Sequence, residues 1–477
     1  MASTDTLTAG VGPRPHDALP WLAATAFFMQ MLDTTILNTA LPAIATDLQR
    51  SPLEMESTVI SYALTVALLI PLSGWLADRF GCRRVFMAAV GLFSLGSLLC
   101  ALSGSLPMLV AMRVLQGVGG AMMMPVARLA LLRSYPRSQF LAVMSTVTMP
   151  GLLGPVLGPL LGGWLVTHAS WHWIFLINLP IGLVGLLMAP RVMSDHKAPH
   201  HPFDWPGFLL FAFALVGLSF GLDLIGAAHA LVLALPALLA GSLLLLAYVR
   251  HARRHAEPLF DLAMFQTRGF RIGIFGNILC RLGTGGITLL IPLLLQVCFG
   301  YGADTAGWML APVALAAILA KPLITRGLPR IGYRRTLIVT SLLTVLSIAS
   351  FALFAADMPL PWMLPSLVLF GGVSSMQMTA MNTLAVADLS SRHTSMGNTV
   401  LSVAQQLSVS FGLAISASAL QLFHPAHVSQ GAALTPAFRA TFVLLSGLTL
   451  LSTLIFLRLK PQDGAAHAVR PVAAGGH

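Results

Sequence analysis

The stretch GWLADRFGCRR, residues 74–84, marks a sharp change from apolar to charged sequence. Residues 57–77 contain no charged side chain and are rich in Leu, Val, Ile and Ala. Four charged residues then follow within seven positions: Asp78, Arg79, Arg83 and Arg84. An apolar run of about 20 residues can cross the hydrocarbon core of a bilayer as a helix, whereas a charge cluster needs water. The stretch therefore predicts the end of a membrane span.

A weaker copy of this motif, RGLPRIGYRR, occupies residues 326–335 and again lies between two apolar runs. It aligns Arg79, Gly81, Arg83 and Arg84 with Arg330, Gly332, Arg334 and Arg335. Repeated boundary motifs are typical of membrane proteins built from internal structural repeats. We therefore expect two related halves.

The composition indicates an all-α polytopic membrane protein. Of 477 residues, 56% are hydrophobic and only 9% are charged, with a mean hydropathy of +0.83. An ordinary soluble domain carries about 25% charged residues. The formal charge of +11 does not predict a nucleic-acid partner, because most basic residues lie in short loops between apolar runs. The four cysteines are dispersed, which predicts neither a metal site nor a disulfide framework: Cys82, Cys100, Cys280 and Cys298.

Apolar periodicity and its interruptions predict fourteen membrane spans. They cover residues 18–40, 57–77, 85–103, 107–131, 138–166, 171–193, 205–225, 230–250, 270–299, 306–328, 336–356, 361–386, 396–423 and 437–459.

The basic motifs follow the second and the tenth of these spans, so an extra pair of spans separates two six-span halves. We expect the following organisation: an N-terminal tail (1–17), a first half (18–193), an inserted pair with flanking loops (194–269), a second half (270–459) and a C-terminal tail (460–477).

The distribution of Lys and Arg predicts the orientation. Most of the 27 basic residues fall on the side of the two motifs, while the opposite loops hold only Arg50 and Arg439. By the positive-inside rule, both termini are expected in the cytoplasm.

Ionisable residues inside the predicted spans are the best candidates for function, because a lone charge at mid-bilayer costs at least ~2.5–3.5 kcal/mol. Asp33 lies near the middle of the first span, where a carboxylate beside an arginine has the properties of a proton-coupling group. A permanent ion pair between Asp33 and Arg113 that only staples two spans is the alternative. The complete set is Asp33, Arg113, Arg128, Asp223, Arg281 and Lys321.

Arg281 and Lys321 have no acidic residue inside the spans of the second half. If both face a central cavity, its positive charge favours an anionic substrate. The alternative is that their side chains snorkel to the membrane surface, which is also the simplest interpretation of Arg128. Asp223 is expected to face either the cavity or the membrane–water interface. Met122 and Met378 belong to Met clusters that form either a mouldable substrate wall or ordinary core.

The fifth span contains GLLGPVLGPLLGG, residues 151–163. Its glycines at four-residue spacing leave one bare helix face for close packing, and its prolines bend the helix. This predicts a helix–helix seam. The residues concerned are Gly154, Gly158, Gly162, Pro155 and Pro159.

Taken together, LDTTILNTALP (32–42), GWLADRFGCRR, RVLQGVGGA (113–121), the Gly–Pro series and WHWIFLINLPIG (171–182) resemble the major facilitator superfamily along essentially the whole chain. The resemblance is to its fourteen-span drug:proton antiporters, and within them to the MdtD-type multidrug transporters. His172 departs from the arginine that most of the family has there, and Pro329 replaces the acid of the first motif.

The resemblance implies export driven by the proton gradient through alternating access, without a cofactor. It implies that Asp33 acts in proton coupling or substrate recognition and that Arg113 acts in proton transfer. The implied cytoplasmic gate is Gly74, Asp78, Arg79, Gly81, Arg83 and Arg84, with glycines that allow close helix approach and a tight turn. The implied antiporter motif is Gly154, Pro155, Gly158, Gly162 and Gly163.

We therefore expect a monomeric, proton-coupled exporter of small molecules. A carboxylate such as citrate or an iron chelate of it is the alternative substrate, and a non-transporting receptor or assembly factor is the alternative class. An enzyme is not expected, because no cluster of nucleophile, base and metal ligands is apparent. The segment with His196, His200 and His201 is either a polar linker or a metal ligand set.

Overall fold

The computed structural model describes residues 18–195, 202–226, 231–390, 393–423, 431–460 and 463. Within these ranges every predicted span is helical and no strand occurs. The first half comprises α1 (Leu19–Asp47), α2 (Glu56–Phe80), α3 (Cys82–Ala101), α4 (Leu106–Ser134), α5 (Arg137–His168), α6 (Trp173–Leu176) and α7 (Asn178–Val192). The short α6 and α7 together form the sixth predicted span.

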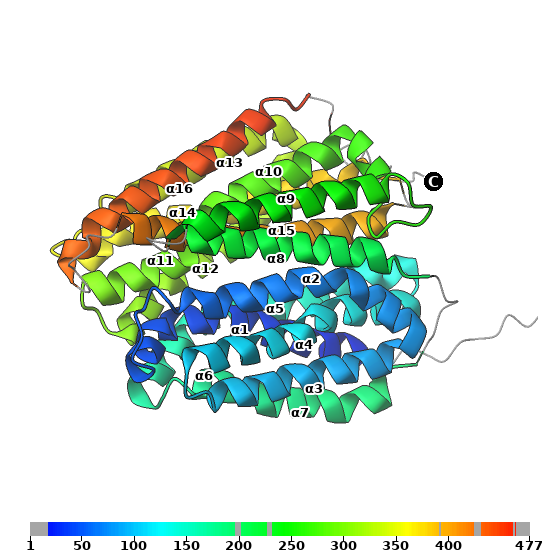
Figure 1. The fold of residues 1–477 in the computed structure, drawn as a ribbon, viewed down its shortest axis with the longest axis horizontal. Coiled ribbons are helices and arrows are strands. Elements are labelled where there is room, and N and C mark those ends of the chain that lie inside the picture. The colour runs from blue at the N-terminus through cyan, green and yellow to red at the C-terminus, as the bar shows by residue number, and fades with distance from the viewer. Residues whose placement is uncertain are drawn as a thin grey trace, which may run out of the picture.

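The inserted pair consists of α8 (Trp205–Gly226) and α9 (Leu231–Ala252), which pack on each other. Helix α8 also contacts α15 and α2, so the pair lies against both halves. The second half comprises α10 (Arg268–Thr284), α11 (Ile287–Leu293), the π-helical η2 (Leu294–Cys298), α12 (Ala303–Ile331), α13 (Tyr333–Phe351), α14 (Leu360–Ala387), α15 (Thr394–Leu422) and α16 (Thr435–Phe456). Short 3-10 turns occur at η1 (Leu262–Gln266) and η3 (Ala432–Leu434). Figure 1 shows the two halves side by side with their long helices running in the same general direction.

The duplication predicted from the basic motifs is visible in the backbone. Gly81 (φ 94°, ψ 145°) and Gly332 (φ 81°, ψ 157°) adopt the same conformation, which is essentially restricted to glycine. Gly117 of α4 packs against the Tyr62 carbonyl of α2, and Gly371 of α14 packs against the Val313 carbonyl of α12. The number of residues between Tyr62 and Val313 equals the number between Gly81 and Gly332. The two packing contacts therefore occur at equivalent positions in the two halves.

Twelve helical segments of the described chain are long and apolar enough to cross a membrane. Two of the fourteen predicted spans, α1 and α14, are not among them. Both are long helices, of 29 and 28 residues. They carry buried polar side chains, which lower their mean hydropathy: Gln30, Asp33 and Asn38 in α1, and Gln377 in α14. The three α1 groups belong to the site described below, whereas Gln377 lies in the interior of the second half.

We call the end of the molecule that carries the Gly81 and Gly332 turns the basic end. The two halves pack most closely at the opposite end. A Cβ on Gly163 of α5 would lie 2.3 Å from the Ala303 carbonyl oxygen of α12. The amide of Gln296 donates to the Thr39 carbonyl at 3.1 Å. One apolar cluster here includes Ile36 and Leu41 from the first half together with Leu290 and Phe438 from the second. This packing closes the interface between the halves at that end.

Candidate functional site

A cavity of about 360 Å³ lies between the two halves. Helices α1, α2 and α4 line it from the first half, and α11 and α15 from the second. Its wall combines apolar side chains such as Phe27 and Met124 with the amides of Gln30, Asn38 and Gln405. This size and mixture are typical of a small-molecule site.

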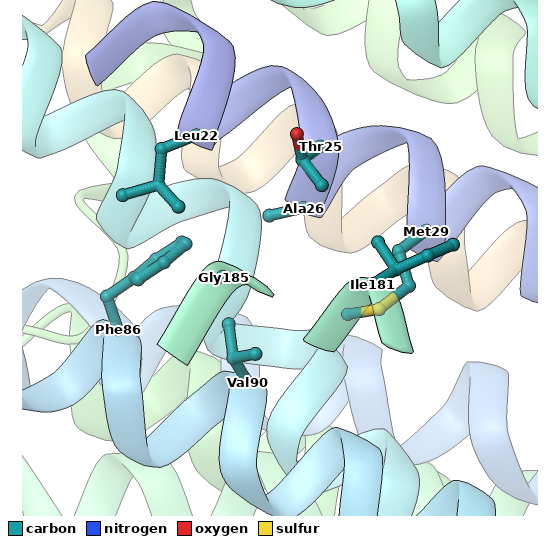
Figure 2. Close-up of a pocket in the computed structure, with 8 residues that line it drawn as sticks. All are labelled: Leu22, Thr25, Ala26, Met29, Phe86, Val90, Ile181 and Gly185. Carbon is teal, nitrogen blue, oxygen red and sulfur yellow. The ribbon is translucent and has the colours of Figure 1, made fainter. Parts of the chain in front are cut away.

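A second, much smaller pocket lies wholly within the first half, between α1, α3 and α7 (Figure 2). Its volume is about 10 Å³ and its lining is almost entirely apolar, with Met29, Phe86 and Val90 around it. Such a space holds at most about one water molecule, so the cavity between the halves is the candidate substrate site.

A buried ion pair forms part of the site. Arg113 reaches the cavity wall from α4, and its Nη1 donates to Asp33 Oδ2 of α1 at 2.7 Å. Both side chains are only 1% exposed. The guanidinium also donates to the Thr58 carbonyl at 3.2 Å and lies 4.3 Å from the centre of the Tyr62 ring. Three helices thus hold the pair, which the sequence predicted as possible partners.

The second carboxylate oxygen of Asp33 is also satisfied. Gln116 donates to Asp33 Oδ1 at 2.7 Å, and Asn178 of α7 donates to the same atom at 3.1 Å. Gln116 and Asn178 both donate further to the Ser97 hydroxyl of α3, at 2.7 and 3.4 Å. Three donors from α4 and α7 thus hold the buried carboxylate in place.

Sequence reasoning missed Gln116, Asn178 and Ser97. Gln116 lies one helical turn after Arg113, and Asn178 lies within the quoted stretch 171–182, so both were in motifs already singled out. Nothing distinguished Ser97 from other small residues of its span.

The proposed gate residues surround the turn at Gly81. Asp78 forms an ion pair with Arg133 at the end of α4. Asp195, which follows α7, lies 3.7 Å from Arg83 and 3.2 Å from Arg84. Arg79 stacks on Trp75. Asp195 and Arg133 were not predicted from the sequence.

The two gate glycines differ. A Cβ on Gly81 would lie 1.9 Å from Asp195 Oδ1, so a side chain there would collide with the carboxylate. A Cβ on Gly74 would meet no atom within 4 Å. The expected close helix approach at Gly74 is therefore wrong for this structure, where Gly74 instead lines a pocket beside Phe203.

The glycine seam of α5 packs against α1 as predicted. Added Cβ atoms would lie 2.1 Å from Thr35 Oγ1 at Gly158 and 2.5 Å from the Ile36 carbonyl oxygen at Gly162. At Gly154 the Leu32 backbone nitrogen would be 2.9 Å away. Pro155 lies inside the same helix, and Gly163 faces the second half instead.

The second-half cations differ from Arg113. Arg281 Nε donates to Asn277 at 2.8 Å, and Asn277 and the cavity-lining Gln405 each donate to Asn382 at 2.8 Å. Within the described residues, neither Arg281 nor Lys321 has a carboxylate at ion-pair distance, and neither lines the cavity. Arg281 is instead connected to the cavity through amides.

Other predicted cavity residues lie elsewhere. Met122 is buried in the core of the first half and Met378 packs in a cluster of the second half, so both belong to the core. Met31 and Met124 line the cavity in their place. The Asp223 side chain lies outside the described part of the chain, as do His196, His200 and His201.

This arrangement of two six-helix halves around a cavity with a buried ion pair defines a secondary transporter of the major facilitator type. The family model described as Major Facilitator Superfamily matches residues 23–412 and 273–474, and the chain belongs to this family.

Among its relatives is the "Putative multidrug resistance protein MdtD" of Pectobacterium carotovorum, 44% identical over 456 residues, or 94% of this chain and 97% of that protein. The "Probable transport protein HsrA" of Haemophilus influenzae is 45% identical over 450 residues, covering 94% and 97% of the two chains.

Solved transporters share the fold at low sequence identity. A D-xylose-proton symporter superimposes with a TM-score of 0.66 and 14% identity, covering 94% of this chain and 98% of that one. A POT family transporter in complex with 5-aminolevulinic acid gives a TM-score of 0.69 and 16% identity, covering 94% and 96%.

Proposed function

We propose that the protein exports small molecules from the cytoplasm in exchange for protons. The observation that carries this proposal is the Asp33–Arg113 pair, fully buried at the wall of the cavity between the halves. Asp33 accepts hydrogen bonds from the Arg113 guanidinium and from the Gln116 and Asn178 amides, so the carboxylate and its cation lie in one buried network. We infer that a rearrangement of this network accompanies proton movement and couples it to transport.

The packing of the halves supports the proposal of alternating access. In the conformation described, they pack tightly at the end opposite the basic turns. Rocking one half against the other would open that end and close the basic end around Asp78 and Arg133. The glycine seam holds α1 and α5 together within the first half, so these two helices would move as one unit. We infer that the Gly81 region is the dominant gate.

The proposed topology has fourteen spans, including α1 and α14, with the basic end and both termini in the cytoplasm of a bacterium. The polar groups that lower the hydropathy of these two helices face inward, where they do not contact lipid. The protein works as a monomer in the inner membrane, without a cofactor.

A substrate screen in proteoliposomes with an imposed pH gradient tests the proposal. We expect at least one amphipathic drug to accumulate when the gradient is present and not when an ionophore dissipates it. Substrate accumulation that does not depend on the pH gradient would contradict proton coupling. An absence of both substrate and proton flux for every compound would favour a receptor or assembly factor.

An anionic substrate such as a carboxylate is the second candidate. It is favoured by Arg281, which has amide but no carboxylate partners in the described chain and connects to the cavity through Asn382 and Gln405. Competition separates the two candidates. If excess citrate inhibits transport, the anion is favoured; if lipophilic cations compete and citrate does not, the anion is excluded.

A further inference from the structure

Three potential metal ligands converge at the basic end of the inserted pair. Asp204 precedes α8, while His251 and His255 lie at the end of α9 and just beyond it. One ligand atom from each side chain lies within 4.8 Å of the others. The backbone N–H of His255 donates to the His251 carbonyl at 3.0 Å, so the helical turn continues and both imidazoles project from the same face.

The distances suit a tetrahedral ion. Asp204 Oδ1 lies 2.8 Å from His251 Nε2 and 3.7 Å from His255 Nε2. For metal–ligand bonds of about 2.0–2.1 Å, the edge of a tetrahedral site is about 3.3 Å. The two observed distances bracket this value, so small movements of exposed imidazoles would complete the geometry. His251 and His255 are 25% and 42% exposed, whereas Asp204 is 1% exposed.

The surroundings fix the Asp204 carboxylate in place. The backbone N–H of Gly207 donates to Oδ1 at 2.9 Å, and that of Leu259 donates to Oδ2 at 3.0 Å. A Cβ at residue 207 would lie 2.1 Å from Oδ2, so the absence of a side chain at Gly207 leaves space for the Asp204 carboxylate. Such supporting hydrogen bonds are typical of ligating carboxylates.

The carboxylate also keeps the capacity to bind an ion. Each carboxylate oxygen has two lone pairs, so Oδ1 can accept from Gly207 and still bind an ion. Glu257 adds a second carboxylate to the pocket that Asp204 lines.

We propose that Asp204, His251 and His255 bind a divalent transition-metal ion of the Zn²⁺ class, with water completing the coordination. Two imidazoles and one carboxylate with an open position are a ligand set that Zn²⁺ accepts. The ion joins the start of α8, the end of α9 and the backbone at Leu259. The same pocket is lined by Gly74, Asp78 and Arg79, so the bound ion stiffens the surface beside the Gly81 region.

The site is tested with Co²⁺ as a spectroscopic probe on full-length, detergent-solubilised protein without a histidine tag. We expect wild-type protein to bind one equivalent with the visible absorption of low-symmetry Co²⁺, and Zn²⁺ to displace it. His251→Ala and His255→Ala are expected to lose this equivalent. His393→Ala is the matched control, because His393 lies 3.3 Å from Asp261 outside the cluster and its loss should leave Co²⁺ binding unchanged.

A second measurement protects the test from folding defects. Zn²⁺ is expected to raise the melting temperature of wild-type and His393→Ala protein but not of the two cluster variants, each compared with its own metal-free melting temperature. The proposal is overturned if His251→Ala and His255→Ala bind Co²⁺ as wild type does, or if wild-type protein binds none at micromolar Co²⁺. It is also overturned if only replacement of His196, His200 and His201 removes binding.

Discussion

The two halves of the molecule share a backbone plan but differ in what they bury. The first half encloses Asp33 and Arg113 in a charged network. The interior of the second half is joined by uncharged groups: Thr344 donates to Gln377 at 2.9 Å, and Ser341 and Ser452 lie 3.0 Å apart. Neutral hydrogen bonds cost less to bury than charges. The proposed proton coupling is therefore assigned to the first half, with the second half as a scaffold.

The basic turns differ in the same way. Gly81 and Gly332 have nearly the same backbone conformation. The first turn is covered by Asp195, whereas a Cβ at Gly332 would meet no atom within 4 Å. Only the first turn therefore packs against neighbouring side chains, so the same substitution should have different effects at Gly81 and Gly332.

The largest effect on stability is expected for Arg113→Ala compared with Arg281→Ala. Removing Arg113 leaves Asp33 buried without its cation, and breaking a buried pair costs about 3–5 kcal/mol. Within the part of the chain that the structure describes, Arg281 has no carboxylate partner to leave unpaired, so its loss should cost less. Melting temperatures of the purified variants measure the difference. A cost at Arg281 equal to that at Arg113 would contradict the contrast between the halves.

A smaller effect, on transport rate, is expected for Asp78→Asn compared with Pro329→Ala. Asp78 is paired with Arg133 and about a third exposed, at 33%, so the pair contributes about 1 kcal/mol, or roughly fivefold in an equilibrium. Pro329 has no corresponding acid. Transport assays at equal membrane levels should show slower switching only for Asp78→Asn, and equal impairment would remove the case for a dominant gate.

A third comparison uses Gly81→Ala and Gly332→Ala. Both place alanine in a glycine-only region of φ and ψ, at a cost of about 1–3 kcal/mol. Only the first also displaces Asp195 from Arg83 and Arg84, so it should lower the transport rate further. The Asp195→Ala variant should reproduce that additional loss. If Asp195→Ala transports like wild type, the contact between Asp195 and the Gly81 turn does not contribute to the transport rate.

The smallest effect is expected for Thr344→Val in the second half. The change removes a neutral hydrogen bond to Gln377, at about 0.5–1.5 kcal/mol, and should leave the pH dependence of transport unchanged. Ser97→Ala is its first-half counterpart and should alter that pH dependence, because Ser97 orients both amides that bind Asp33. A pH profile that shifts for Thr344→Val would mean that the second half takes part in proton binding.

The sequence was sufficient for the helices and the duplication, because apolar length, charge boundaries and glycine turns are local signals. It also singled out Asp33 and Arg113, since a charge inside an apolar run is conspicuous. It could not identify Asn178 or Asp195 as partners, because such contacts depend on the rotation and offset of separate helices. The same limit explains why Met122 and Met378 point into the core while Met31 and Met124 line the cavity.

The role of Asp33 is the central claim, and proton-driven transport by Asp33→Asn tests it most directly. Asparagine keeps the size of the side chain but cannot ionise. In inverted vesicles with equal amounts of protein, we expect this variant to lose accumulation driven by the pH gradient while retaining substrate counterflow, which needs no net proton movement. Normal gradient-driven accumulation by Asp33→Asn would contradict the account.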